Sequence, residues 1–268
     1  MSVQASVFSA RWALVTGASS GIGLEFARQL AAEKANLVLV GRSKGALASL
    51  ASSLSGRDGV QVEVIEADLA EPTASKNIVN QLQKKRISVD ILINCAGFGD
   101  FGFFVESDWK RQFDMLQVNI VALMELTHLL LPSMVSQKRG WILNVASTAA
   151  FQSGPLMAVY YASKSFVLSF SQAIANEVQD SGVTVTALCP GPTKTGFQKA
   201  AHLDVKDPIR GLRMASAESV AKAGLKGLRA GHTVVIPGTR NRVLAYVARV
   251  LPSDFTANYV RGLQEKRR

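Results

Sequence analysis

The amino-acid sequence predicts an α/β fold, a doubly wound parallel sheet of about seven strands with helices on both faces. Three observations lead to this prediction. Short apolar runs recur from one end of the chain to the other. Most of the segments between them are longer and have helical periodicity. The runs are continuous in Val, Ile and Leu rather than alternating, which is typical of strands that helices cover on both faces.

The predicted elements alternate between strand and helix along the chain. The strands are expected at Ala13–Val15, Leu37–Val40, Val62–Ile65, Ile91–Ile93, Ile142–Val145, Val183–Leu188 and Val234–Ile236. The helices are expected at Gly21–Glu33, Ala46–Leu54, Asp108–Ser136, Met157–Gln179 and Ser216–Arg229. Pro132 is the only proline inside these helices. Such alternation is what a parallel sheet with helical crossovers requires.

Length and composition predict one globular domain that spans residues 1–268. The chain is 48% hydrophobic and 19% charged, and it contains no Ser/Gly/Pro-rich linker, low-complexity tract or internal repeat. Residues 190–215 lack clear periodicity and follow a predicted strand, where α/β folds place ligand-closing loops. We therefore expect a substrate lid at 190–215 and a C-terminal extension at 240–268.

The chain carries a formal net charge of +10, from 30 Lys and Arg against 20 Asp and Glu. Such a charge attracts phosphate-bearing cofactors, CoA or carrier-protein thioesters, and anionic lipid. Nucleic acid is not expected as a partner, because no internal basic run is interleaved with aromatic residues. The basic end Lys266–Arg268 is expected to be a frayed tail.

Cysteine usage and the N-terminal residues predict a cytoplasmic protein. Cys95 and Cys189 lie beside apolar runs, lack CxxC spacing and have no histidine set nearby, so we expect buried reduced thiols and no metal site. Residues 1–10 have no basic start and no apolar stretch, which argues against a cleaved signal peptide. We see no run that approaches the roughly 20 apolar residues of a membrane span, so the chain is expected to be soluble or at most peripheral.

Three glycines open the first predicted helix. Directly after the first strand, the segment that begins at Thr16 reads Thr-Gly-Ala-Ser-Ser-Gly-Ile-Gly. Its glycines allow backbone N–H groups to approach a pyrophosphate, whose charge the positive end of the helix dipole stabilises. An ordinary tight turn is the alternative, but the strand before and the helix after are the context of a Rossmann-type nucleotide site. The predicted cofactor contacts of this turn are Gly17, Ser19, Ser20, Gly21, Ile22 and Gly23.

The end of the second predicted strand favours NADPH over NADH. Many NAD-binding folds place an acidic residue there to accept hydrogen bonds from the ribose hydroxyls, whereas this chain has Arg42 followed by Ser43. A guanidinium pairs with a 2′-phosphate through charge-assisted hydrogen bonds, and the Ser43 hydroxyl adds a donor. The alternative for Arg42 is a solvated arginine on the surface.

Further cofactor contacts are expected at the ends of the third and fourth strands. Asp68, followed by Leu69, can accept a hydrogen bond from the adenine amino group. Ala96 and Gly97 stand where a dinucleotide passes the sheet edge. Asn94 has two interpretations that the sequence leaves open: a cofactor contact, or a structural amide that joins adjacent strands.

Ser147, Tyr160 and Lys164 predict the chemistry. Tyr160 and Lys164 are four residues apart on one face of a predicted helix, and Ser147 follows the fifth strand, thirteen residues before Tyr160. Hydride addition to a carbonyl creates an alkoxide that needs a proton, which a tyrosine with a pKa near ~10 holds too tightly for reversible exchange. We expect the Lys164 ammonium to lower the pKa of Tyr160 and to bind the nicotinamide ribose, while Ser147 polarises the substrate oxygen. Tyr161, off this shared face, is expected to pack.

Over roughly residues 10–200 the chain resembles the short-chain dehydrogenase/reductase family. The motifs that carry the resemblance are Thr16-Gly17-x-x-x-Gly21-x-Gly23, Asn94-x-Ala96-Gly97, Asn119, Ser147, Tyr160-x-x-x-Lys164 and Pro190-Gly191. The resemblance implies that Asn119 holds a water in a proton relay to Lys164. It also implies that Ser147 orients the substrate and that Pro190, Gly191 and Thr193 contact the nicotinamide. Without the family, the favoured interpretation of Asn119 is an asparagine that caps or bridges a kinked helix.

The C-terminal region departs from part of this family. Members similar to the 3-oxoacyl carrier-protein reductases often have a Gly-Gly turn after the last strand, whereas this chain continues from Ile236 with Pro-Gly-Thr-Arg. An apolar stripe with nearby arginines follows, made of Val243, Leu244, Tyr246, Val247, Val250 and Leu251. It predicts contact with a membrane surface or a partner helix, or packing against the chain's own fold. This end resembles the branch of 17-beta-hydroxysteroid and long-chain 3-oxoacyl-CoA reductases, without their membrane spans.

The predicted function is hydride transfer between NADP(H) and a carbonyl or alcohol, with Tyr160 as the general acid/base and no metal. Two other functions stay open. One is an NADPH-binding sensor without turnover, for which Ser147, Tyr160 and Lys164 would be unnecessary. The other is an epimerase or dehydratase of the same fold, in which the tyrosine and lysine abstract a proton.

The expected substrate is a small carbonyl or alcohol, hydrophobic or an acyl thioester, which the sequence does not identify further. Phe98, Phe101, Phe103 and Phe104 either line a hydrophobic substrate pocket or belong to the core. By the family resemblance, a homodimer or homotetramer is expected to form through the two long helices near 108–136 and 157–179.

Overall fold

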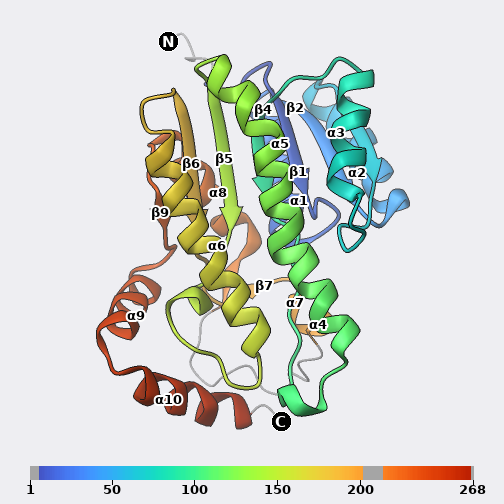
Figure 1. Ribbon diagram of the computed structural model, residues 1–268. Helices are drawn as coiled ribbons and strands as arrows, with labels where there is room; N and C mark the ends of the chain where they lie inside the picture. The colour runs from blue at the N-terminus through green and yellow to red at the C-terminus, as the bar shows by residue number, and fades with distance from the viewer. Residues whose placement is uncertain (1–5, 202–213, 267–268) are drawn as a thin grey trace.

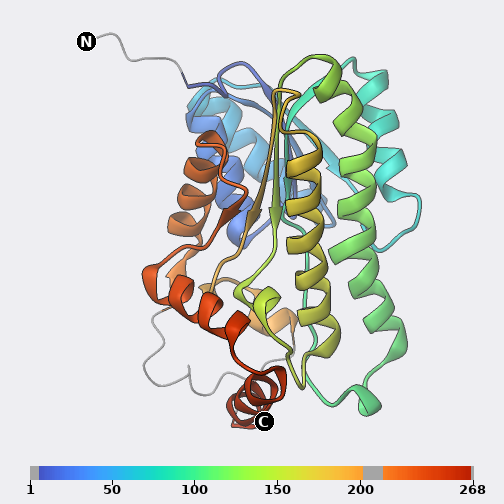
Figure 2. The same ribbon diagram turned by 60° about the vertical axis from the view of Figure 1, so that its left-hand side comes forward.

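The computed structural model describes residues 6–201 and 214–266 (Figure 1). Of the predicted lid at 190–215, residues 202–213 lie outside this described part, and so do residues 267–268 of the C-terminal extension. The main sheet has seven strands, with helices on both of its faces (Figure 2). The predicted fold class is therefore confirmed.

All seven predicted strands are present, and each pairs in parallel with its neighbours. They are β1 (Trp12–Thr16), β2 (Asn36–Gly41), β3 (Val62–Glu66), β4 (Val89–Asn94), β5 (Gly140–Val145), β6 (Val183–Leu188) and β9 (Val234–Val235). Their order across the sheet is β3-β2-β1-β4-β5-β6-β9. The chain winds outward from β1 to β3 and then returns to β4 on the other side of β1. This reversal opens a crevice at the carboxyl ends of β1 and β4.

Helices bury both faces of the sheet. One face packs against α1 (Gly21–Ala32), α2 (Lys44–Asp58) and α8 (Ala217–Arg229). The other packs against α3 (Ala74–Lys84), α5 (Ala122–Ser136) and α6 (Ala158–Glu177). Phe26 and Leu30 of α1 and Leu225 of α8 are fully or almost fully buried against the first face, as Leu126 of α5 is against the second. Burial on both sides explains why the strands are continuous apolar runs.

Several elements were not predicted from the sequence. They are the helices α3, α7 (Phe197–Ala200), α9 (Thr239–Val250) and α10 (Ser253–Glu265), the 3-10 turns η1 (Phe104–Glu106) and η3 (Thr148–Phe151), and a small sheet of β7 (Thr193–Lys194) and β8 (Ala215–Ser216). Helix α3 was missed because it is mostly polar. Ile78 and Leu82 are its buried large apolar side chains, too few to mark a helical period.

The predicted helix near 108–136 consists of three segments. Asp108 caps α4 (Trp109–Leu116) by accepting a hydrogen bond from Lys110 N at 3.0 Å, a π-helical turn η2 (Gln117–Val121) follows, and α5 completes the rod. This rod of 28 residues has a mean hydropathy of 1.6 over its most apolar stretch, so by length and composition it is long and apolar enough to cross a membrane. No such segment was expected from the sequence. The inner face of the rod instead packs within the fold, against β4, β5 and α3.

Two asparagines form a polar layer in the middle of the sheet. Asn94 of β4 and Asn144 of β5 are register partners, and the Asn94 amide donates to Asn144 Oδ1 at 2.9 Å and to Thr127 Oγ1 at 3.2 Å. Asn144 in turn donates to Ser171 Oγ on α6 at 2.9 Å. Asn94 is buried and its amide nitrogen belongs to this network, which agrees with the structural interpretation. Its Oδ1 has no hydrogen-bond partner among the described residues, and the cofactor contact of Asn94 stays a prediction.

We predict that Asn144→Ala lowers the free energy of unfolding by about 2 kcal/mol, because it leaves the buried amide of Asn94 and the hydroxyl of Ser171 each without one hydrogen-bond partner. Urea unfolding followed by circular dichroism measures the loss. Asn176→Ala, at an exposed position of the same helix α6, is the matched control. Equal stabilities for the two variants would contradict the structural role of this layer.

Candidate active site

A cleft of about 1120 Å³ lies at the carboxyl ends of the strands. It brings together residues that are far apart in the sequence. The predicted site residues on its wall are Gly17, Ser19, Ser20, Gly21, Ile22, Gly23, Arg42, Ser43, Asp68, Leu69, Ala96, Gly97, Ser147, Tyr160, Lys164, Pro190, Gly191 and Thr193. Asn94 and Asn119 are the two predicted residues that do not line it.

The glycine turn is packed too tightly for side chains. Gly17 has a φ of +66°, and a Cβ there would lie 3.0 Å from the Cα of Ala96. A Cβ at Gly23 would lie 2.3 Å from the carbonyl oxygen of Gly17. The Thr16 hydroxyl holds the facing turn by accepting from the N–H groups of Cys95 and Ala96, both at 3.0 Å. The turn therefore presents backbone N–H groups, at the start of a helix whose first turn contains no acidic residue.

The far end of the cleft has a cationic and an anionic side chain. Arg42 and Ser43 are exposed where β2 ends. Asp68, after β3, is exposed too, and its Oδ1 accepts a hydrogen bond from Ala70 N at 3.0 Å. The Arg42 guanidinium thus stands in solvent at the rim of the cleft, where it can meet a negative group.

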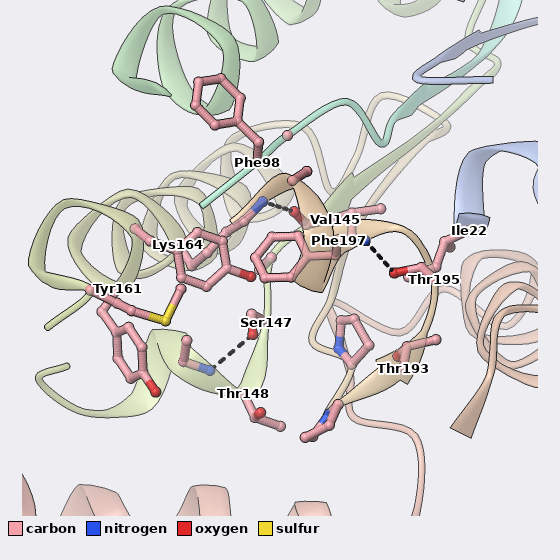
Figure 3. A pocket seen from close by; sticks show the side chains of 18 of the residues that line it. Ile22, Phe98, Val145, Ser147, Thr148, Tyr161, Lys164, Thr193, Thr195 and Phe197 are labelled. Carbon is pink, nitrogen blue, oxygen red and sulfur yellow. Dashed lines mark hydrogen bonds between the residues drawn. The ribbon is translucent and has the colours of Figure 1, made fainter. Parts of the chain in front are cut away.

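Lys164 lies at the centre of the cleft. Only 5% of its surface is exposed, and its Nζ donates to the carbonyl oxygen of Val145 at 2.8 Å (Figure 3). The same Nζ is 5.8 Å from the ring centroid of Tyr160. Ser147, two residues beyond Val145, accepts from Ala149 N at 3.1 Å, which leaves its hydroxyl hydrogen to donate. Strand β5 and helix α6 together set these positions.

Burial dominates the protonation of the tyrosine and the lysine. It raises the pKa of Tyr160 to about 12, although a hydrogen bond with Ser147 acts in the opposite direction. It lowers the pKa of Lys164 to about 8. The expectation that Lys164 depresses the pKa of Tyr160 is therefore wrong for this structure, since burial of the phenol raises that pKa and the lysine is not among the groups that lower it. At neutral pH the pair is a neutral phenol beside an ammonium.

Asn119 stands in the π-helical turn η2, behind the cleft wall. Its Oδ1 accepts from Phe98 N at 3.1 Å, and its Nδ2 donates to Phe98 O at 3.0 Å and to Ser163 Oγ at 3.0 Å. The Ser163 hydroxyl donates to the carbonyl oxygen of Tyr160 at 2.7 Å. Asn119 thus bridges a widened helix to the loop after β4 and to α6, which is the interpretation that the sequence favoured without the family.

Helix α4 also positions the loop after β4. Arg111 Nε donates to Asp100 Oδ1 at 2.7 Å, and its guanidinium carbon lies 5.2 Å from the ring centroid of Phe98. Arg111 also donates to the carbonyl oxygen of Ala200 at the end of α7. Of the four phenylalanines after Gly97, only Phe98 lines the main cleft. Phe103 and Phe104 line a separate cavity of about 190 Å³, and Phe101 is half-buried.

Phe197 is a cleft residue that the sequence did not indicate. It begins α7, inside the predicted lid, and its ring centroid lies 5.2 Å from that of Tyr160. The Thr195 hydroxyl accepts a hydrogen bond from its backbone N–H at 3.2 Å (Figure 3). The described part of the lid therefore covers Tyr160 with an aromatic ring. No periodicity in this short segment marked Phe197 in advance.

The C-terminal helices form the remaining wall. Gln264 of α10 donates to the hydroxyl of Tyr161 at 3.3 Å, and Tyr161 packs closely over Gly154, which confirms that this tyrosine has a packing role. Asn241 of α9 lies against Gly191, where a Cβ would come within 2.6 Å of its amide. Leu244 and Leu251 add apolar surface. Among the described residues, no group of three His, Cys, Asp or Glu side chains is placed to bind a metal.

Comparison with known proteins identifies relatives of the chain. A family model described as short chain dehydrogenase matches residues 11–206. The very-long-chain 3-oxoacyl-CoA reductase of Laccaria bicolor is 37% identical over 181 residues, 66% of this chain and 53% of that protein. The ketoacyl reductase HetN of Nostoc sp. is 33% identical over 224 residues, 83% of this chain and 77% of that protein.

The solved structures include a similar fold with a nucleotide. A short-chain dehydrogenase from Sphingobium yanoikuyae in complex with NADPH has a TM-score of 0.80 and 33% identity, and covers 88% of this chain and 93% of its own. The match to the Laccaria protein spans about half the length of that relative. By name, that relative falls in the branch of long-chain 3-oxoacyl-CoA reductases that the sequence pointed to.

We predict a pH-dependent cost of burying Lys164. Its pKa is lowered to about 8 in the folded chain, so between pH 8 and the unfolded value of 10.5 the unfolded state binds more protons and stability rises with pH. Relative to Lys164→Met, the wild type should gain about 2 kcal/mol of unfolding free energy between roughly pH 7 and 9.5.

Urea unfolding of both proteins at the two pH values provides the measurement. The raised pKa values of Cys95 and Tyr160 give the opposite slope at high pH, but both groups are present in both proteins and largely cancel in the difference. A difference that stays constant with pH would show that the lysine is not buried as described.

Proposed function

The chain belongs to the short-chain dehydrogenase family, and from this premise we propose that it transfers hydride between NADP(H) and the carbon of a carbonyl or alcohol. The observation that carries the proposal is one cleft that contains Ser147, Tyr160 and Lys164 together with the glycine turn. A protein that only binds a nucleotide would not need Ser147, Tyr160 and Lys164 together in one place. We propose residues 1–268 as one catalytic domain.

A pyridine nucleotide fits this cleft on the structure's own geometry. The glycine turn leaves room only for backbone, which suits a pyrophosphate, and Arg42 with Ser43 suits a 2′-phosphate. The adenine would lie near Asp68 and Leu69, and the nicotinamide end near Pro190, Gly191 and Thr193, with Ala96 and Gly97 between. When bound, the nucleotide supplies or accepts the hydride.

Tyr160 would act as the proton donor in the direction of reduction. Its pKa of about 12 keeps the phenol protonated at neutral pH, ready to donate to an oxygen that gains negative charge. The Lys164 ammonium, charged below about pH 8, stabilises the phenolate left behind. Ser147 would donate a hydrogen bond to the substrate oxygen. Asn119 acts as a positioning residue, because it holds the loop at Phe98 and, through Ser163, helix α6.

The proposed substrate is an apolar carbonyl compound, including acyl thioesters. Apolar side chains of α9 and α10 line the cleft beyond Tyr160, and the net charge of +10 favours phosphate-bearing carriers such as CoA. The name of the Laccaria relative agrees with this substrate class.

We further propose a cytoplasmic location, which suits the free thiols Cys95 and Cys189. We also propose a homodimer or homotetramer that forms through the α4–α5 rod and α6, because these helices expose the apolar side chains Phe113, Met124 and Phe166.

Tyr160→Phe tests the proposed chemistry. It should reduce NADPH oxidation at least about a thousandfold, because it removes the donated proton, while nucleotide binding measured by fluorescence titration stays near normal. The rate is followed as loss of NADPH absorbance with ketones, aldehydes and 3-oxoacyl thioesters. Tyr161→Phe is the matched control and should keep near-normal rates. If Tyr160→Phe turns over as fast as the wild type, the assignment of Tyr160 as the proton donor is wrong. If the wild type binds NADPH but turns over none of the substrates, the sensor becomes the favoured function.

Arg42→Asp tests the choice of nucleotide. The change removes a charge-assisted hydrogen bond to the 2′-phosphate and introduces repulsion, so the Kd for NADPH should rise about a hundredfold while that for NADH changes little. Lys84→Asp, which changes the net charge equally at an exposed position outside the cleft wall, is the control. An unchanged ratio of the two dissociation constants would remove the argument for NADP(H).

A further inference from the structure

Helices α9 and α10 expose a row of large apolar side chains, which we call the apolar rim. It consists of Leu244, Val247, Val250, Leu251, Phe255 and Tyr259. Every member of the apolar stripe predicted at 243–251 is exposed, from 38% at Leu251 to 81% at Val250, so the alternative that the stripe packs against its own fold is wrong. Both helices lie at one end of the molecule, beyond the carboxyl ends of the strands (Figures 1 and 2). Contiguous exposed apolar surface of this kind marks an interaction site.

The apolar rim is continuous with the cleft. Five of its six members, all except Val250, also line the cleft wall. Leu244 and Phe255, for example, are more than half exposed and also face the space beyond Tyr160. The five shared side chains thus give the rim and the cleft wall a common apolar surface, along which an apolar molecule can enter the cleft.

A second segment brings apolar side chains to the same end. The loop after β4 and the start of α4 expose Phe104, Val105 and Trp109, with Val105 at 92% and Trp109 at 67%. In both views this part of the chain, at η1, lies at the same end of the molecule as α10 (Figures 1 and 2). Two parts of the chain that are far apart in the sequence thus carry exposed apolar side chains at the same end of the molecule. Tryptophan and tyrosine among them are typical of membrane interfaces.

The charge of the two C-terminal helices selects the kind of surface that they meet. Between residues 239 and 266 five basic residues stand against two acidic ones. The basic residues are Arg240, Arg242, Arg249, Arg261 and Lys266, and the acidic ones are Asp254 and Glu265. Two of the cations have partners within the fold, because Arg249 lies over the ring of Phe151 at 5.0 Å and Arg261 pairs with Glu265 at 2.7 Å. The excess of basic residues still suits a bilayer with anionic lipid, where apolar groups enter the acyl boundary and exposed cations such as Arg242 meet phosphate. A two-fold contact with a second copy would instead bring this positive charge against itself.

We propose that the apolar rim seats the protein on an anionic phospholipid bilayer, with the mouth of the cleft facing the lipid. Exposed Phe104, Val105 and Trp109 form the second point of contact. Two separate contacts fix the orientation of the molecule relative to the bilayer, whereas a single helix would allow it to tilt. That an apolar carbonyl substrate passes directly from the bilayer into the cleft is a further step, which rests on the proposed function; the membrane contact itself does not.

Vesicle cosedimentation of the full-length protein tests the contact. Vesicles of phosphatidylcholine with about 30% phosphatidylserine should bind the protein at roughly 0.15 M salt, and pure phosphatidylcholine should bind it at least about tenfold more weakly. The double variant Val250→Glu, Phe255→Glu should lose at least about tenfold in affinity for the anionic vesicles. Arg242→Glu should lose about tenfold too, and high salt should remove that difference.

Matched controls separate this surface from general effects. Val7→Glu places the same charge on an apolar side chain that is 47% exposed, in the segment before β1 and outside both the apolar rim and the cleft wall. Lys84→Glu repeats the charge reversal of Arg242→Glu on α3. Both controls should bind vesicles like the wild type. None of the substituted side chains is buried, so every variant should fold, which thermal unfolding followed by circular dichroism checks.

Each outcome decides the proposal. Loss of vesicle binding in the rim variants, with the controls unaffected, supports it. It is overturned if the wild type binds neither type of vesicle, or if rim variants and controls bind alike. It is also overturned if the rim variants change only the oligomeric state in analytical ultracentrifugation, because the occupant is then a second copy. None of these readouts depends on catalysis, so a failure here and a failure of the proposed function remain distinguishable.

Discussion

The hydrogen bond from the buried Lys164 ammonium to the Val145 carbonyl joins the two halves of the site. It fixes the first turns of α6 to the end of β5, and it thereby holds Tyr160 close to the carboxyl end of that strand. A buried cation is costly, and the lowered pKa of Lys164 shows that cost. The fold accepts it because the main-chain carbonyl at a strand end is a rigid partner. Residues of the site that are far apart in the sequence are positioned relative to this bond.

Polar contacts behind the site keep that geometry in register. Asn94 and Asn144 join β4 to β5, and Asn144 continues to Ser171 on α6. Asn119 connects the same helix, through Ser163, to the loop after β4. Both networks are buried, and apart from Asn94 Oδ1 their amide groups are paired, so each partner specifies the position of the next. Apolar side chains of equal size at these positions would pack as well, but they would allow α6 to shift more easily relative to the ends of β4 and β5.

The sequence predicted most of the fold, and all but two of the predicted site residues line the cleft, but the walls made by Phe197 and by α9 and α10 were not predicted. Continuous apolar runs located every strand of the main sheet, and the strand ends placed the glycine turn, Arg42 and Ser147 at one edge. The polar helix α3 was not predicted, because its buried large apolar side chains, Ile78 and Leu82, are too few to show the periodicity of a helix. The pKa of Tyr160 was predicted in the wrong direction, because desolvation depends on what surrounds the phenol in space. The sequence could not decide the role of Asn94, because an amide at the end of a strand can either contact a cofactor at the sheet edge or join the neighbouring strand.

The π-helical turn in the α4–α5 rod limits how the protein can change length. A π turn contains one residue more than an α-helical turn, and it holds that residue so that the helices before and after it keep their faces. Removing a residue between Gln117 and Val121 would restore a regular helix but would take away the bulge from which Asn119 reaches Phe98 and Ser163. Inserting or deleting a residue elsewhere in the rod would rotate α4 relative to α5 by about 100°, and Arg111 would leave Asp100 and the end of α7. The rod should therefore tolerate many substitutions on its outer face but no insertion or deletion, a constraint on its evolution that no single side chain reveals.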